Sequence, residues 1–299
     1  MPVRTDLAIE CREMFAGEIS GVESTKKDAD GITVTHVKIT TREGAEKIGK
    51  PMGSYVTIEI TEMHREDEDI FQRGAKAVET ELRKLVNISP KDSVLVVGLG
   101  NRYITPDSIG PKTVGKLTVT RHITKDAGNG FDFGIRPVSA VAPGVLGITG
   151  IETTEIVKGV VEHVKPSLII AVDALASRKL SRLGTTVQLS DTGISPGSGV
   201  GNNRKELTKE TLGVPVIAVG VPMVVDAVTL TIDVMESLSN YIKDRQKAVN
   251  LSSCENPALI NAAIPENLVV TPNDVDVISE QASDIIAEGI NMALLGANG

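Results

Sequence analysis

Three short runs that are apolar at nearly every position form the strongest pattern in this chain. Continuous apolar runs of this length are typical of strands buried on both faces of a parallel sheet. We expect the three strands to end near Gly98, Val172 and Gly220, and to lie parallel in one sheet. The runs cover residues 93–100, 167–174 and 214–221.

Two other patterns complete the predicted fold. Residues 31–40 and 54–62 alternate apolar with polar positions, as half-buried strands do, and the charged stretch 41–53 between them reads as a loop. Apolar residues recur at helical spacing over four further segments. Strands that alternate with helices predict an α/β fold: a mostly parallel sheet with helices on both faces and extra N- and C-terminal elements. The four helical segments are 70–85, 153–164, 228–242 and 276–295.

Composition narrows the possible functions. The 299 residues carry a net charge of −8 and contain no Trp, which disfavours binding to nucleic acid. Two distant cysteines suggest no disulfide framework, and the N-terminus lacks a signal-peptide core. The longest apolar stretch, 214–225, is interrupted by proline and glycine and is too short to span a bilayer. We therefore expect a soluble, cytoplasmic protein without a membrane partner.

Two aspartates follow buried strands, where open α/β sheets bind their ligands. Asp107 comes after the turn that follows the first strand, and Asp173 directly follows the apolar run that ends at Val172. Asp107 has a structural alternative as a helix cap. Asp173 would need a partner if it were buried, such as Arg178 or Arg182. If neither alternative holds, both carboxylates open on one cleft at the carboxyl edge of the sheet.

Two carboxylates that share a cleft can divide one proton between them, so that a general acid stands beside a general base. This pair is sufficient to activate water against an amide carbonyl. Which aspartate is the acid and which is the base stays open at this stage.

Other motifs are weaker. The turn GLGNRY has Tyr103 where a dinucleotide-binding loop needs its third glycine. Ser195 lies in a G-x-S-x-G string, but a glycine-rich loop follows it where a nucleophile elbow requires a helix. The four histidines form no zinc motif, and we expect no metal or other cofactor.

Several longer segments of the sequence together resemble one known protein family. They include GLGNRYITPDSIGPK, SAVAPGVLGITGIETTEIVKGVVE, IIAVDALASRKLSRLGTTVQLSDTGISPGSGVGNNRKEL and VIAVGVPMVVDAVTL. Together they resemble the germination proteases of endospore-forming bacteria over about residues 3–235. That resemblance implies an α/β fold similar to hydrogenase-maturation peptidases, and an atypical aspartic endopeptidase that degrades small acid-soluble spore proteins. Its aspartate pair corresponds to Asp107 and Asp173 here.

The resemblance also implies a zymogen that removes its own N-terminal segment. Thr5-Asp6-Leu7-Ala8 fits the cleavage pattern of the family, an acidic residue before a large apolar residue and Ala, with Glu10 in the place of a downstream acid. The implied cleavage lies between Asp6 and Leu7, which leaves 1–6 as a short propeptide and 7–299 as a single elaborated peptidase domain. A homotetramer and a location in the spore core are implied as well.

Two other functions remain open. The first is a hydrogenase-maturation-like peptidase that senses a metal ion, although the third strand, VIAVGVPMVVDA, has no histidine after it. The second is a binding module without catalytic activity, in which the two aspartates only cap helices or form ion pairs.

Overall fold

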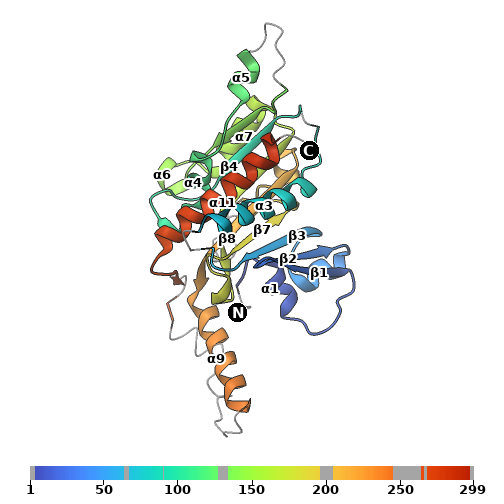
Figure 1. The fold of residues 1–299 in the computed structure, drawn as a ribbon, viewed down its shortest axis with the longest axis vertical. Coiled ribbons are helices and arrows are strands. Elements are labelled where there is room, and N and C mark those ends of the chain that lie inside the picture. The colour runs from blue at the N-terminus through green and yellow to red at the C-terminus, as the bar shows by residue number, and fades with distance from the viewer. Residues whose placement is uncertain are drawn as a thin grey trace.

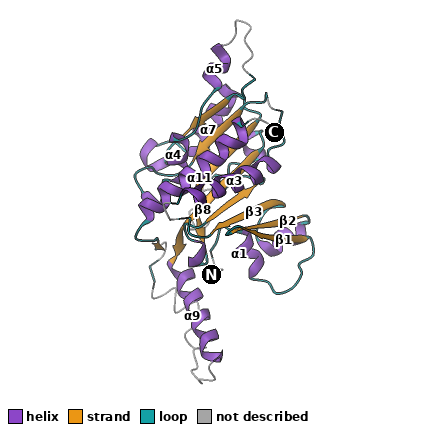
Figure 2. Ribbon diagram, in the orientation of Figure 1, coloured by secondary structure: helices purple, strands orange, loops and turns teal. Residues whose placement is uncertain are grey.

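A computed structural model describes residues 4–63, 67–89, 91–126, 134–195, 205–244, 264–265 and 268–296. These residues build one mixed sheet with helices on both faces (Figures 1 and 2). The strand order is β1-β2-β3-β7-β8-β6-β4-β5, and β9 pairs with β8 beside this path. The predicted α/β class, with a parallel core and additional terminal elements, is confirmed.

Four strands form the parallel half of the sheet. β4 pairs in parallel with β5 and with β6, and β6 pairs in parallel with β8. The three apolar runs therefore lie parallel in one sheet, as predicted. The strands are β4 (Val94–Gly98), β5 (Val138–Val141), β6 (Leu168–Ser177) and β8 (Val216–Asp226).

Two of these strands end later than predicted. β4 ends at Gly98, but β6 continues to Ser177 and β8 to Asp226, and the two pair along this extra length with a bulge after Leu175. Ala174–Ser177 contain no β-branched residue and resemble a helix start in the sequence, whereas pairing with β8 holds them extended. Asp173 therefore lies inside β6, one residue past the position opposite the end of β4.

The other half of the sheet is antiparallel. Its strands are β1 (Val22–Ala29), β2 (Ile32–Ile39), β3 (Gly53–Ile60) and β7 (Thr186–Ser190), and the short β9 (Val269–Val270) is antiparallel to β8. The two strands predicted from the alternating pattern are confirmed, since they correspond to β2 and β3. β1 has no apolar stripe because it is an exposed edge strand. β7 was not predicted, although its five residues, TVQLS, alternate polar and apolar positions.

Helices cover both faces. On one face α3 (Glu68–Leu85), α4 (Ile109–Gly115) and α11 (Val275–Leu295) pack over a core that includes Val96 and Ile170. On the other face α7 (Thr153–Val164) and α8 (Lys209–Leu212) pack over Leu95 and Ile169. Alternate residues of one strand thus enter two different cores.

Two short helices cover the antiparallel half. α1 (Ala8–Glu13) and α2 (Arg42–Ile48) pack on β2 and β3. α2 lies where the sequence predicted a loop, and that prediction was wrong. Thr41 caps it by accepting the N–H of Gly44 at 3.1 Å, and Gly49 ends it in the left-handed region. Such local caps stabilise a short helix despite its charge.

The remaining helices lie at the periphery. They are α5 (Arg121–Asp126), α6 (Leu146–Thr149) and α9 (Ala227–Asp244), with two 3₁₀ turns, η1 (Thr105–Asp107) and η2 (Leu180–Arg182). α9 projects away from the sheet (Figure 1). Among the described helices, none combines the length and apolar character that a membrane crossing requires.

Candidate functional site

Asp173 is the one acidic residue of β6, whose other residues are apolar except for Ser177. It is 4% exposed, and its Oδ1 accepts the N–H of Ala174 at 2.9 Å. The two arginines considered as its partners contact other acids. Arg178 lies beside Asp233 and Glu236, and Arg182 beside Glu10, Glu13 and Glu59.

Asp107 lies in η1, between the end of β4 and the start of α4. It is half-buried, and its Oδ2 accepts the N–H of Asn101 at 2.9 Å across the turn. Ser108, not Asp107, stands at the N-cap of α4. The helix-cap alternative for Asp107 therefore finds no support.

The turn after β4 brings the two aspartates to the same edge of the sheet. The N–H of Leu99 donates to the carbonyl of Val172 at 2.8 Å, which places the turn beside Asp173. Gly100 has a φ of 106°, and a Cβ there would lie 2.1 Å from the carbonyl oxygen of Asp107. Only glycine allows this close approach, so the turn holds Asp107 against the end of the parallel strands.

A small cavity of about 110 Å³ opens beside Asp173. Its lining combines Asp173 of β6 and Gly220 of β8 with Gln188 of β7 and with Asp6, the residue before the predicted cleavage point. Asp107 is not among the described residues that line it. The structure therefore brings Asp6 and Asp173 together in one cavity and places Asp107 on the neighbouring turn.

The N-terminal segment is bound along β6. The N–H of Asp6 donates to the carbonyl of Ala176 at 2.9 Å, and the N–H of Ala176 donates to Oδ2 of Asp6 at 2.8 Å. Leu7 is completely buried and packs with Ile9 and Leu175. Residues 4–6, which directly precede the predicted cleavage point, are half-buried. Residues 1–3 lie outside the described part.

Two side chains hold this segment further. Gln188 accepts the N–H of Ala8 at 2.7 Å through Oε1 and donates to the carbonyl of Asp6 at 3.1 Å through Nε2. Glu10 is buried, and it accepts the N–H groups of Arg178 at 2.6 Å and Lys179 at 3.0 Å. A carboxylate thus lies at each end of the segment in contact with backbone N–H groups.

Ionisable groups around the segment are strongly perturbed. Burial would raise the pKa of Glu13, but hydrogen bonds from Arg182 and Lys179 outweigh it and lower that pKa to about 2. Burial raises the pKa of Tyr55, which lines the cavity, to about 12. Its hydroxyl donates to the carbonyl of Pro51 at 2.8 Å. Tyr55 is therefore neutral, whereas Glu13 is charged above pH 3.

The structure also locates the weaker candidates. Ser195 lines the cavity, and its hydroxyl donates to Glu206 at 2.9 Å, while residues 196–204 of its loop lie outside the described part. His36 of β2 pairs with Glu81 of α3 at 2.9 Å and is not among the described residues that line the cavity. Within the described ranges no three His, Cys, Asp or Glu side chains gather closely enough to hold a metal ion.

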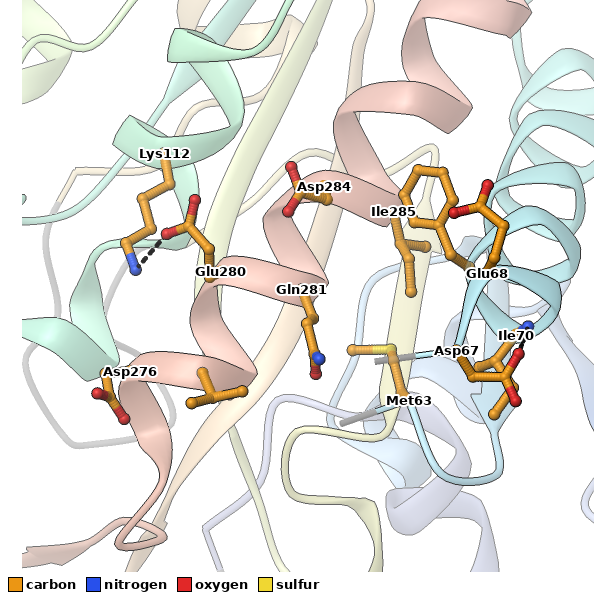
Figure 3. A pocket seen from close by; sticks show the side chains of 12 residues that line it. Met63, Asp67, Glu68, Ile70, Lys112, Asp276, Glu280, Gln281, Asp284 and Ile285 are labelled. Carbon is orange, nitrogen blue, oxygen red and sulfur yellow. Dashed lines mark hydrogen bonds and ion pairs between the residues drawn. The ribbon is translucent and has the colours of Figure 1, made fainter. Parts of the chain in front are cut away.

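A second and larger cavity, of about 860 Å³, lies between α3 and α11 (Figure 3). Its apolar floor includes Met63 and Ile285, and Lys112 of α4 pairs with Glu280 of α11 at 3.0 Å at its edge. None of Asp6, Asp107 and Asp173 is among its lining residues. The sequence-predicted residues therefore point to the smaller cavity.

Sequence reasoning missed the residues of the antiparallel half that complete this cavity. Gln188 lies in TTVQLS, where a polar residue in a short strand is ordinary, and Lys50 lies in the stretch that reads as a loop. No local pattern distinguishes these positions, because their role comes from contacts with residues more than 40 positions away.

Comparison with known proteins gives a consistent result. The family model described as germination protease matches residues 5–261. Germination proteases of Caldanaerobacter subterraneus subsp. tengcongensis and Clostridium acetobutylicum are 47% and 48% identical, over 98% of this chain and 94% and 95% of theirs. That of Bacillus subtilis is 40% identical over 98% of this chain and 93% of its own.

Among solved structures, a [NiFe] hydrogenase maturation protease, HycI from Thermococcus kodakarensis KOD1, covers 48% of this chain and 80% of its own. Its identity of 19% and TM-score of 0.31 are too low to assign a shared fold. The match to the family model and the curated relatives, in contrast, extends over most of the chain. This chain is a peptidase and belongs to the germination protease family.

Proposed function

We propose that this protein is an endopeptidase that uses Asp107 and Asp173 to begin the degradation of small acid-soluble spore proteins, and that it first cuts its own chain between Asp6 and Leu7. One observation carries the proposal. Asp6, whose carbonyl carbon would be attacked, lines the same cavity as Asp173. The segment that contains the bond is held there by backbone and side-chain hydrogen bonds.

The chemistry follows from two carboxylates at one sheet edge. The ionised member removes a proton from water, whose oxygen adds to the carbonyl carbon of Asp6. The protonated member gives its proton to the nitrogen of Leu7 as the C–N bond breaks. The products are a new carboxyl group on Asp6 and a new amine on Leu7. The pair regains its starting state by passing one proton between its members.

The same contacts support a substrate of matching sequence. Asp6 is recognised by the N–H of Ala176, and the buried Leu7 packs against Leu175. A substrate protein that presents an acidic residue followed by a large apolar residue would make the same contacts after residues 1–6 have left and Leu7, which remains in the mature chain, has moved away from Leu175. The spore core, where small acid-soluble proteins lie, is the corresponding proposed location.

A homotetramer is part of the proposal. Val234 and Leu238 are one helical turn apart on α9, and their side chains are 46% and 49% exposed. An apolar face on a projecting helix is suited to contact with another copy of the chain. Light scattering should give the mass of four chains for the wild type, and a smaller mass for a Val234→Glu, Leu238→Glu double variant.

The decisive experiment is direct. Purified protein is incubated with a small acid-soluble spore protein, and mass spectrometry identifies the bond that is cut and the new N-terminus of the enzyme. The proposal requires a cut after an acidic residue in the substrate and an enzyme that begins at Leu7. An intact substrate, or a mature enzyme that still carries Met1, would contradict it.

A further inference from the structure

The antiparallel half of the sheet contributes Gln188, whose contacts reach across the predicted cleavage point. Its Oε1 accepts the N–H of Ala8 at 2.7 Å, and its Nε2 donates to the carbonyl of Asp6 at 3.1 Å. These two backbone groups flank Leu7, one on each side. A backbone N–H can only donate and a carbonyl can only accept, so the orientation of the side-chain amide is fixed by its partners.

Sheet register places Gln188 and Asp173 in one row. Gln188 of β7 lies opposite Gly220 of β8, and Gly220 lies opposite Asp173 of β6. Directly paired residues project from the same face of a sheet, so all three belong to the face covered by the N-terminal segment. With neighbouring strands about 4.8 Å apart, the Cα atoms of Gln188 and Asp173 are separated by about 10 Å.

Gly220 leaves the middle of this row without a side chain. A Cβ at this position would lie 2.6 Å from Cγ of Leu175. The cavity lies over this gap, with Asp6, Gln188 and Asp173 all in its lining. Between the amide of Gln188 and the carboxylate of Asp173, the row therefore presents backbone and the packed side chain of Leu175.

The side-chain amide of Gln188 is buried, and its hydrogen bonds go to the N-terminal segment. Gln188 is 8% exposed, and both ends of its amide are used by the N-terminal segment. An apolar side chain of similar volume would fill this position but could not make the hydrogen bonds to Ala8 and Asp6. These hydrogen bonds hold the carbonyl that water must attack and the N–H one residue beyond the bond.

We propose that Gln188 is a further catalytic residue of this peptidase: its side-chain amide holds the chain to be cut, and its N–H polarises the carbonyl of Asp6, which belongs to the scissile bond. The proposal rests on the proposed function, because the bond between Asp6 and Leu7 is taken as the one that is cut. As charge develops on the carbonyl oxygen, the bond from Nε2 becomes stronger, which lowers the barrier. Oε1 accepts the N–H of Ala8 and so holds the part of the chain that follows the scissile bond.

Three variants of the full-length chain test this. Gln188→Glu can still accept from Ala8 but, when ionised, cannot donate to Asp6, whereas Gln188→Met can do neither. Thr57→Val is the matched control, since Thr57 is the fully buried neighbour of Gln188 in the same row, on β3, and its hydroxyl is unpartnered. The rate of appearance of chains that begin at Leu7 is measured by mass spectrometry from neutral to acidic pH, with thermal unfolding beside it.

We expect both Gln188 variants to process about 10²-fold more slowly than the wild type at neutral pH, and Thr57→Val to process within about twofold. The ratio of Gln188→Glu to wild type should rise as pH falls, because a protonated carboxyl regains an O–H donor for the carbonyl of Asp6. The ratio for Gln188→Met should stay flat.

Two results for the Gln188 variants would overturn the proposal. Wild-type rates in both Gln188 variants, or a Gln188→Glu ratio as flat as that of Gln188→Met, would leave Gln188 with a packing role only. If Gln188→Met does not fold, the pH dependence of Gln188→Glu decides alone. Failure of the proposed function looks different: then the wild type does not begin at Leu7, or Asp107→Asn and Asp173→Asn chains process normally.

Discussion

The parallel and antiparallel halves of the sheet differ in how their polar residues are distributed. In β6 and β8 nearly every position is buried, because helices or the N-terminal segment cover both faces. In β1, at one edge of the sheet, every residue after Val22 is exposed. A carboxylate is therefore exceptional in β6, whereas a polar residue in the antiparallel half is ordinary.

The candidate site lies where these two halves meet, between β8 and β7. The parallel half provides Asp173, and the turn after β4 adds Asp107. The antiparallel half provides Gln188 and, through η2, contacts to the N-terminal segment. In the proposed function the proton-transferring aspartates belong to the parallel half, whereas both halves hold the N-terminal segment, β6 through Ala176 and β7 through Gln188.

The largest effect should come from the aspartates near the parallel strands. Replacing Asp107 or Asp173 by Asn keeps the shape of the side chain and removes the proton, and should slow peptide cleavage by about 10²- to 10⁴-fold for each. The double variant should lose far less than the product, because the pair acts as a unit. Cleavage rates and thermal unfolding of the variants provide the measurement.

Asp191→Asn is the matched control from the antiparallel half. Asp191 accepts the N–H of Ser54 at 2.8 Å, and an amide oxygen can do the same. This variant should cleave at close to the wild-type rate. A large loss at Asp191, or none at Asp107 or Asp173, would break the division between the two halves.

Stability should also differ between the halves. Ile170 in β6 is completely buried, and Ile170→Ala should lower the free energy of unfolding by about 2–5 kcal/mol through lost burial and a residual cavity. Lys27 in β1 is exposed, and Lys27→Ala should change the free energy of unfolding by less than about 0.5 kcal/mol. Denaturant unfolding at one fixed protein concentration compares them. Equal effects would show that burial does not separate the two strands.

Gly220 of β8 lies between Gln188 and Asp173 where the two halves of the sheet meet, and Gly220→Ala tests whether a side chain fits there. The new methyl group would meet the side chain of Leu175, so we expect a loss of about 1–3 kcal/mol from overpacking. In a Leu175→Ala background the obstructing side chain is gone, and the same substitution should be much less destabilising. Strictly additive losses in this double-mutant cycle would contradict the predicted contact.

The smallest effect concerns pH. Glu13 has a pKa of about 2 in the folded chain, below its usual value near 4.5, because its bonds to Arg182 and Lys179 outweigh burial. Its contribution to stability is complete above pH 4.5 and is lost as pH falls through 2. The difference in unfolding free energy between wild type and Glu13→Gln should shrink over that range. A difference that stays constant would show that Glu13 gains nothing from its partners.

Several features could be predicted from the sequence because they depend on local order. Buried parallel strands need continuous apolar runs, which identified β4, β6 and β8, and helical spacing identified α3, α7, α9 and α11. Asp173 stood out because a carboxylate beside such a run is costly to bury. Asp107 followed from its place after the first of these strands.

The tertiary structure decided what depends on partners far away in the chain. Pairing with β8 extended β6 beyond Asp173, and pairing with β3 and β8 makes a strand of the five alternating residues of β7. The exposed β1 carries no apolar pattern of its own. The contacts of Gln188 join it to Asp6 and Ala8, about 180 positions earlier. No local spacing encodes such a contact, because only the folded sheet brings these residues into hydrogen-bonding distance.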